Sequence, residues 1–378
     1  MISPVSFVDT LEGIGIDFYA GVPDSLLQNL CACITERLDA GKHIIAADEG
    51  AAVALAAGHY LATGRPGCVY LQNSGEGHII NPLASLTDPD VYGIPVLLLI
   101  GWRGRPGVPD EPQHSRQGRV TTALLEVMGV DYELLSPVED HFAAQVERAA
   151  AALRERKVFA FVIEKDTFEY YKAAEAEEKP PLPLGREEAI QTVSAAIGEK
   201  DCIVSSTGMI SRELFDYRSL MGEGHERDFL TVGSMGHASQ IALGIALAQP
   251  QRRIWCFDGD GAVIMHLGSL AVLADKSPGN LIHVVFNNGA HDSVGGQPTV
   301  GLKMDLPGVA RAMGYPTVRS ASNKADLLVI LSEVKNLPGP VFIEVKVRKG
   351  HRSNLGRPTT TPAGNKEALM NFLKGPCL

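Results

Sequence analysis

Several features that would place the chain in a specialised class are missing from its sequence. Its six cysteines include no CxxC pair and no histidine at metal-ligand spacing, so they predict free thiols of a cytoplasmic protein. No apolar run approaches the length of a membrane span, and the N-terminus lacks a basic, signal-like segment. The sequence therefore predicts neither export nor membrane attachment.

Positive charge is also scarce. The formal net charge is −10, and no basic stripe offsets it, so we expect no nucleic-acid partner. An anionic ligand must instead be held by a local cluster, for which the arginines between residues 103 and 119 are candidates. The chain has 378 residues, 45% of them hydrophobic, which is enough to build two ordinary domain cores.

The two halves of the chain repeat one layout. They align without a gap over much of their length, at a constant offset that pairs Gly58 with Gly244. Residues 51–75 and 237–261 both read as an Ala- and Gly-rich helix, a turn, and an apolar strand that ends in a glycine loop. This pattern predicts an α/β fold made of two doubly wound parallel-sheet domains, in which ligands bind at the carboxyl ends of the strands.

The predicted boundary lies in a charged, proline-rich stretch, residues 172–184, where no periodic pattern survives. It gives the domains 1–178 and 179–378.

Polar residues follow two successive apolar strands of the second half. Gly259-Asp260-Gly261 closes one strand, and Asn287-Asn288 closes the next. This spacing places a carboxylate and an amide at neighbouring strand ends, where their oxygens suit Mg²⁺ that also holds phosphate oxygens. The glycines let the backbone approach a diphosphate, and a helix beginning near Ala262 would direct its N-terminus at it.

Together these two motifs resemble the signature of thiamine-diphosphate-dependent enzymes. The resemblance implies that thiamine diphosphate is the cofactor and that Mg²⁺ is bound by Asp260, Asn288 and the backbone of Ala290. It also implies that residues 1–178 bind the pyrimidine ring and residues 179–378 bind the diphosphate and the metal. The cofactor would then lie at a subunit interface of a homo-oligomer.

Two further elements fit this family. Glu49, in AADEGAAVALAAGHYLATG, matches the glutamate that pairs with the aminopyrimidine ring and allows its amino group to deprotonate the thiazolium carbon. Opposite Glu49 in the internal alignment stands Met235, which follows Gly233 and Ser234 in the loop GSMG. The family places a bulky apolar residue there to hold the cofactor bent, and methionine can fill such an irregular gap.

Asp24 and His114 resemble the acid/base residues of the decarboxylase branch. A decarboxylated intermediate must be protonated before release, and a histidine or a carboxyl group of raised pKa can supply that proton. The alternatives are a helix cap for Asp24 and a surface position for His114.

The short chain leaves no room for a third domain and resembles the phosphonopyruvate decarboxylase subfamily along essentially its whole length. The matching segments are GVPDSLL, NSGEGHIINPLASL, LLLIGWRGRPGVPDEPQHSRQGR, GSMGHASQIALGIAL, GDGAVIMHLGSL and LIHVVFNNGAHDSVGGQPTV. The resemblance implies decarboxylation of 3-phosphonopyruvate to phosphonoacetaldehyde and CO2, within phosphonate biosynthesis.

A substrate of this kind, a small anionic 2-oxo acid, needs cationic forks, and Arg103 is the leading candidate. The other candidate substrate ligands stand at the same predicted strand ends: Asn73, Ser74, Arg105, His291, Asp292 and Ser293. Glu76, His78 and Arg105 depart from the subfamily pattern, and Glu76 and Arg105 could form a swapped charge pair.

Three alternatives remain open from the sequence. The nearest is sulfopyruvate decarboxylase, whose substrate differs only in its head group. A nucleotide-dependent oxidoreductase would share the doubly wound sheet, although the chain has neither a GxGxxG nor a GxxxxGK[ST] loop in the required setting. An inactive cofactor-binding subunit is the third.

Overall fold

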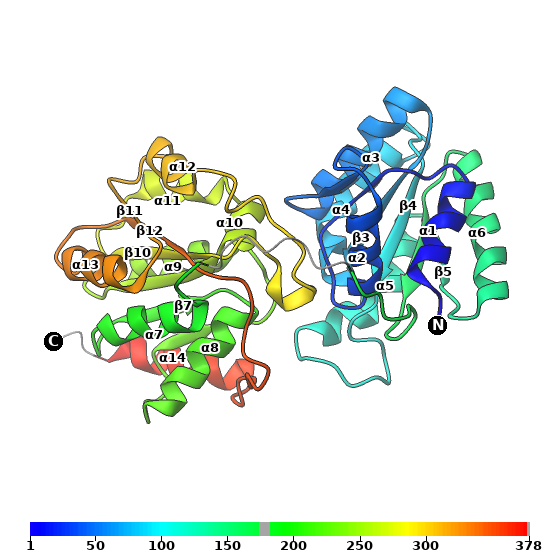
Figure 1. Ribbon diagram of the computed structural model, residues 1–378. Helices are drawn as coiled ribbons and strands as arrows, with labels where there is room; N and C mark the ends of the chain where they lie inside the picture. Colours follow the sequence, from blue (N-terminus) through cyan, green and yellow to red (C-terminus); the bar gives the residue numbers. More distant parts are fainter. Residues whose placement is uncertain (174–181, 376–378) are drawn as a thin grey trace. The chain divides into compact units, whose positions relative to one another are not determined.

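The computed structural model describes residues 1–173 and 182–375. The chain forms two compact units, Met1–Glu177 and Glu178–Leu378, each with helices on both sides of one sheet (Figure 1). The boundary that the sequence predicts between residues 178 and 179 lies outside the described residues. In the described part, no helix combines the length and apolar character needed to cross a membrane.

The first unit is built on a six-stranded parallel sheet with the strand order β2-β1-β3-β4-β6-β5. Its central strands are buried except for Gln72 at the end of β3, as their continuous apolar sequences require of a sheet covered on both faces. The strands are β1 (Tyr19–Gly21), β2 (His43–Ile45), β3 (Gly67–Gln72), β4 (Val96–Gly101), β5 (Asp131–Leu134) and β6 (Phe159–Ile163).

Two separate hydrophobic clusters cover the faces of this sheet. One face is packed by α1 (Pro4–Gly13), α2 (Gln28–Arg37) and α6 (Glu139–Arg154). The other is packed by α3 (Glu49–Thr63), α4 (Glu76–Pro82) and α5 (His114–Val127). Short turns of helix, η1 (Asn73–Gly75) and η2 (Leu83–Thr87), flank α4.

Local sequence fixes the ends of α3, the helix that carries Glu49. The Asp48 side chain caps its first turn by accepting a hydrogen bond from the backbone N–H of Ala51 at 2.9 Å. Gly64 ends the helix in the left-handed conformation, with φ of 72°.

The second unit contains a six-stranded parallel sheet with the order β11-β12-β10-β9-β7-β8. The strands are β7 (Cys202–Ser205), β8 (Asp228–Leu230), β9 (Ile254–Gly259), β10 (Leu281–Asn287), β11 (Thr317–Ala321) and β12 (Val341–Lys346). One face is packed by α7 (Arg186–Ala196), α8 (Met209–Leu220) and α13 (Lys324–Val334). The other is packed by α9 (Ala238–Ala248), α10 (Asp260–Met265), α11 (Ser269–Lys276), α12 (Leu306–Ala312) and α14 (Pro362–Lys374).

The predicted internal repeat is confirmed by topology. Numbered within its own unit, each sheet runs in the order second, first, third, fourth, sixth and fifth strand. The helices α3 and α9 carry the matched Gly58 and Gly244, and β3 and β4 correspond to β9 and β10. The fold class is therefore the predicted one, with candidate site residues at the carboxyl ends of the strands.

Candidate active site

Glu49 is a buried carboxylate at the first position of α3. Its side chain is 6% exposed, and its Oε2 lies 2.5 Å from Nδ1 of His78 on α4. Gly75 packs directly against the carboxylate, since a Cβ at that position would overlap it. The His78 contact was not predicted, although His78 was recognised as a departure from the subfamily pattern.

Asn73, at the end of β3, is used within the protein. Its side-chain amide donates to the backbone oxygen of Arg103 at 2.8 Å and to Oγ1 of Thr121 at 2.9 Å, and its Oδ1 accepts from the backbone N–H of Arg103. The side chain is fully buried. Its hydrogen-bonding groups thus fix the loop after β4. The role of Asn73 as a substrate ligand stays a prediction.

Arg103 is held by an internal carboxylate. Its Nε and Nη2 form a fork with Asp110 at 2.8 and 2.5 Å, and its Nη1 donates to Oγ of Ser25 at 2.8 Å. Burial opposes ionisation of Asp110, but the hydrogen bond from Arg103 holds the Asp110 pKa well below its usual range. The bidentate edge predicted for a substrate is therefore occupied by Asp110, and the donors left over lie on Nη1 and Nη2.

Asp24 has the surroundings of an acid/base group. It is fully buried, its Oδ2 accepts from the backbone N–H of Leu26 at 2.9 Å, and Oδ1 has no hydrogen-bond partner among the described residues. Burial raises the pKa of Asp24 to about 6, which brings it close to neutral pH. Gly101, at the end of β4, leaves the space that its carboxylate fills.

His114 begins α5 and is only 6% exposed, so it is not the surface histidine of the alternative interpretation. Gly104, in the left-handed region with φ of 68°, packs against the backbone of His114. This packing fixes the start of α5 beside the loop that carries Arg103.

The suggested pair between Glu76 and Arg105 does not form. Arg105 forms an ion pair with Glu164 and lies over the ring of Trp102. Glu76 is 2% exposed, and neither of its carboxyl oxygens has a hydrogen-bond partner in the described residues. Burial raises the pKa of Glu76 to about 8, an effect that the nearby Thr121 hydroxyl offsets only in part. Burial therefore favours the neutral carboxylic acid form of Glu76.

Ser74, the remaining predicted contact of this loop, is exposed. Its hydroxyl accepts a hydrogen bond from Nε2 of Gln72 at 2.6 Å.

Asp260 in the second unit has no cationic partner among the described residues. It begins α10 directly after β9 and is 2% exposed, and its Oδ2 accepts from the hydroxyl of Thr299. Its Oδ1 lies 3.4 Å from the backbone N–H of Asn288. Burial raises the pKa of Asp260 to about 6. A buried carboxylate at a strand end, with the backbone of Asn288 beside it, fits a hard divalent cation, which would stabilise its ionised form.

Asn288 and Ala290 lie together in the loop after β10. Oδ1 of Asn288 accepts from the backbone N–H of Ala290 at 3.1 Å, and its Nδ2 donates to Asp292 at 2.8 Å. The Asn288 amide oxygen therefore belongs to the same loop as the Ala290 carbonyl, as a shared metal site requires.

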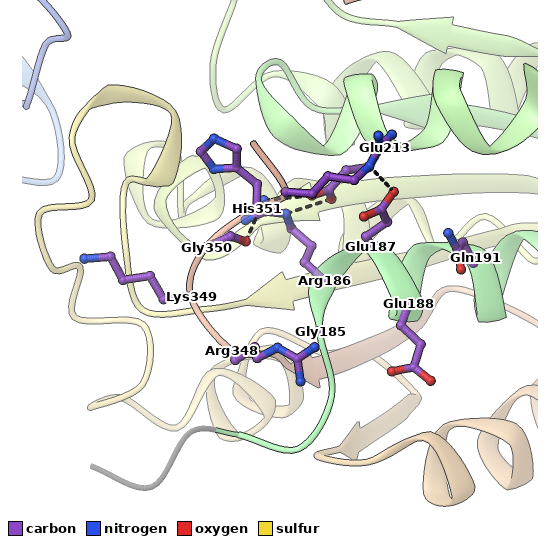
Figure 2. A pocket seen from close by; sticks show the side chains of 11 residues that line it. Gly185, Arg186, Glu187, Glu188, Gln191, Glu213, Arg348, Lys349, Gly350 and His351 are labelled. Atoms are coloured by element: carbon purple, nitrogen blue, oxygen red, sulfur yellow. Dashed lines mark hydrogen bonds and ion pairs between the residues drawn. The ribbon is translucent and has the colours of Figure 1, made fainter. Parts of the chain in front are cut away.

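Asp292 anchors this loop to α7. Its Oδ2 accepts from Nη1 of Arg186 at 2.7 Å and from the backbone N–H of Gly350 at 3.0 Å. Arg186 also forms a fork with Glu213, both contacts being 2.9 Å. Figure 2 shows Arg186 in a hollow of about 450 Å³, with Gly350 and Glu213 among its lining residues. These contacts and the bond from Asn288 all use Oδ2 of Asp292, so this oxygen is engaged within the protein. The role of Asp292 as a substrate ligand stays a prediction.

His291 lies against the first turn of α10. A Cβ at Gly261 would come within 3.0 Å of its Cε1 and within 3.5 Å of Cε of Met235. Burial lowers the pKa of His291 to about 4, so its imidazole is neutral at pH 7. Met235 and His291 are thus both placed at Gly261. Ser293 is exposed and adjoins Gly208.

The loop after β8 has an unusual backbone. Gly233, Ser234 and Gly236 all have positive φ, with values of 72°, 47° and 82°. A serine in the left-handed region is uncommon, and such conformations cluster at ligand-binding sites. The loop predicted to contact the cofactor therefore has the kind of backbone conformation that is typical of ligand-binding sites.

Two segments of the chain match domains of one enzyme class. Residues 5–124 match the thiamine pyrophosphate enzyme, N-terminal TPP binding domain, and residues 206–345 match its C-terminal TPP binding domain. The first segment contains Glu49, and the second contains Asp260 and Asn288. The chain is therefore a thiamine-diphosphate-dependent enzyme.

Three relatives align with almost the whole chain. A phosphonopyruvate decarboxylase of Streptomyces viridochromogenes is 35% identical over 100% of this chain and 96% of its own. Another, of Streptomyces hygroscopicus, is 36% identical over 96% and 92%. A sulfopyruvate decarboxylase of Methanosarcina acetivorans is 28% identical over 97% and 95%. The chain belongs to the phosphonopyruvate decarboxylase family, a group of carboxy-lyases that act on 2-oxo acids. This family assignment replaces two alternatives left open by the sequence, a nucleotide-dependent oxidoreductase and an inactive cofactor-binding subunit.

Proposed function

We propose that the enzyme decarboxylates 3-phosphonopyruvate to phosphonoacetaldehyde and CO2, with thiamine diphosphate and Mg²⁺, as a step of phosphonate biosynthesis. The observation that carries the proposal is the pair of strand-end sites, Glu49 in the first unit and Asp260 with Asn288 in the second. The full-length similarity to two phosphonopyruvate decarboxylases supports the choice of substrate.

Asp260, Asn288 and the carbonyl of Ala290 would hold Mg²⁺, because all three supply oxygen ligands. The backbone of Gly259, Gly261 and Ala262 would accommodate the diphosphate, since a glycine leaves room for close approach. Met235, with Gly233 and Ser234, would support the cofactor beside Gly261. When bound, thiamine diphosphate supplies the nucleophilic carbon and the electron sink that allow CO2 to leave.

Glu49 would exchange a proton with the pyrimidine ring, a role that suits a buried carboxyl group held in one position. Asp24 would supply or accept the proton at the substrate, because its raised pKa leaves both protonation states accessible near neutral pH. His114 is the second candidate for this proton transfer.

Arg103 would bind the phosphonate with the donors that Asp110 and Ser25 leave available. Asp110 fixes the guanidinium plane in advance, which lowers the cost of ordering a long side chain. Arg105 and Ser74, both at this end of the first sheet, are further candidates, and His291 would line the cofactor side. The sulfopyruvate decarboxylase relative makes sulfopyruvate the second candidate substrate.

We infer a homo-oligomer in which a second copy covers α3. A shallow hollow of about 490 Å³ runs beside this helix and is lined mainly by apolar side chains, among them Ala51, Ala54 and Leu55. It lies on the helix that begins with Glu49, so a partner seated there would reach the active-site edge. The test mixes inactive Glu49→Ala and Asp260→Ala proteins after dissociation. Activity should return if the site is shared between chains, whereas no recovery would contradict the shared site.

The substrate assignment is tested by CO2 release from phosphonopyruvate, sulfopyruvate and pyruvate, measured side by side with thiamine diphosphate and Mg²⁺. We expect the highest kcat/KM for phosphonopyruvate. A higher value for sulfopyruvate would transfer the assignment to the second candidate.

A further inference from the structure

His78 stands out because it contacts Glu49, the proposed catalytic glutamate, and departs from the subfamily pattern. Its Nδ1 lies 2.5 Å from Oε2 of Glu49, a short distance for a charge-assisted hydrogen bond. The two side chains differ in access to solvent. The His78 side chain is 34% exposed, whereas that of Glu49 is 6% exposed. The imidazole therefore connects a buried carboxylate with the surface of the first unit.

The backbone around the pair is arranged for this contact. Gly50, the second residue of α3, lies so close to α4 that a Cβ would come within 2.8 Å of the His78 backbone oxygen. Gly75 leaves the space that the Glu49 carboxylate occupies from the other side. Small residues at both positions let α3 and α4 approach until His78 reaches Glu49.

We propose that His78 is a positioning residue that holds Glu49 and delivers protons to it from solvent. In the transfer, the Nδ1–H bond of the imidazolium breaks and an O–H bond forms at Oε2 of Glu49. The neutral imidazole then regains a proton from water or buffer. The proposal rests on the proposed function, because Glu49 needs a proton only when it serves the cofactor ring.

The charges facing His78 favour its protonated form. The hydrogen bond to Glu49 raises the pKa of His78, with further electrostatic support from Glu49 and Asp48, and burial only partly opposes them. Both carboxylates belong to the N-terminus of α3, against which α4 packs. The raised pKa of His78 favours the protonated imidazole, which is the form that donates a proton to Glu49.

The first test needs no cofactor. The His78 ring is titrated by NMR in the wild-type protein and in Glu49→Gln. We expect the pKa of His78 to fall in the variant, because its acceptor is no longer an anion. An unchanged His78 titration would overturn the pairing regardless of the substrate.

The second test measures deuterium exchange at the reactive carbon of bound thiamine diphosphate, independently of turnover. We expect His78→Asn and His78→Ala to slow this exchange by about tenfold or more at neutral pH, with little change in cofactor affinity by calorimetry. Added imidazole should restore the rate in His78→Ala. The exposed His141 of α6 supplies the control, since His141→Asn should exchange at the wild-type rate.

Two outcomes would overturn the proposal: wild-type exchange in His78→Asn, or slow exchange in His78→Ala that imidazole does not restore. Failure of the proposed function gives a different result, namely no accelerated exchange in the wild-type enzyme itself.

Discussion

The two units share one topology but place different chemistry at the same edge of their sheets. In the first unit, the edge carries groups that we propose transfer protons, with Glu49 against His78 and Asp24 buried beside Gly101. In the second, it carries the proposed oxygen ligands of Mg²⁺, with Asp260 close to Asn288. On this proposal, the repeated fold supplies the positions, and the residues placed there determine whether an edge transfers protons or holds a cation.

One buried carboxyl group at each edge, Asp24 in the first unit and Asp260 in the second, allows the two edges to be compared by experiment. Burial raises the pKa values of both Asp24 and Asp260 to about 6. For Asp24, this value is useful because an acid/base group needs both protonation states. For Asp260, the proposed Mg²⁺ would favour the ionised carboxylate and so lower the pKa that burial raises. Substitutions at the two edges should therefore impair different properties: proton transfer in the first unit and metal-dependent cofactor binding in the second.

The largest expected effect is that of Glu49→Gln. This variant should retain thiamine diphosphate but lose about a thousandfold or more in kcat, because the amide cannot exchange the proton. Calorimetry for binding and a CO2 assay for turnover separate the two properties. A comparable loss of cofactor affinity would show that Glu49 is mainly a binding residue.

Asp260→Ala tests the proposed metal site of the second unit. It removes a charged metal ligand, so we expect Mg²⁺-dependent cofactor affinity to fall by about a hundredfold or more, beyond the usual effect of losing a residue that merely supports a ligand. Titrating cofactor at fixed Mg²⁺, with Thr299→Val as the control for its hydroxyl contact, measures this effect. Mg²⁺-dependent binding that survives in Asp260→Ala would exclude Asp260 as a ligand.

Arg103→Ala tests the substrate side of the first unit. We expect roughly a hundredfold loss in kcat/KM for phosphonopyruvate and little change for the weaker substrate pyruvate, which has no second anion. Arg103→Lys should recover only part, because the fork to Asp110 is lost. An unchanged ratio of the two efficiencies would move the search to Arg105 and Arg116.

Asp110→Asn is the matched control for this experiment. It keeps Arg103 but weakens the fork that orients it, so its effect on phosphonopyruvate should be smaller than that of Arg103→Ala. A larger effect would mean that Asp110 itself contacts the substrate.

The fold could be predicted from the sequence because its strands and helices follow from periodic patterns of apolar residues. The repeat that pairs Gly58 with Gly244 reflects apolar strands and close-packed helices, which depend on local sequence. The strand-end positions of Asp260 and Asn288 followed from the same pattern, whereas Glu49 was predicted from the resemblance to the family. Local sequence does not reveal which polar groups already have partners. Asn73, Asp292 and the fork edge of Arg103 looked available, yet each is engaged by a residue from another segment.

Such pairings depend on tertiary distances rather than on spacing along the chain. Arg186 and Asp292 are 106 residues apart in the sequence, and no local motif predicts their contact. Glu76 and Arg105 illustrate the opposite error. Both depart from the subfamily pattern, which suggested an ion pair between them. Instead, Arg105 forms an ion pair with Glu164, and the carboxyl oxygens of Glu76 are buried without a hydrogen-bond partner among the described residues.

The smallest predicted effect concerns this isolated Glu76. Its pKa rises from the ordinary value of 4.5 to about 8 in the folded protein, so the folded state binds the extra proton between these two values. Folding stability from this group is therefore present at low pH and falls as the pH rises toward 8, by at most about 1.4 kcal/mol per pH unit. Glu76→Gln keeps the shape and removes the titration. The difference in urea midpoint between wild type and variant, measured at pH 5 and pH 8 at one protein concentration, should shift in favour of the variant at pH 8. A difference that does not depend on pH would mean that folding does not raise the pKa of Glu76.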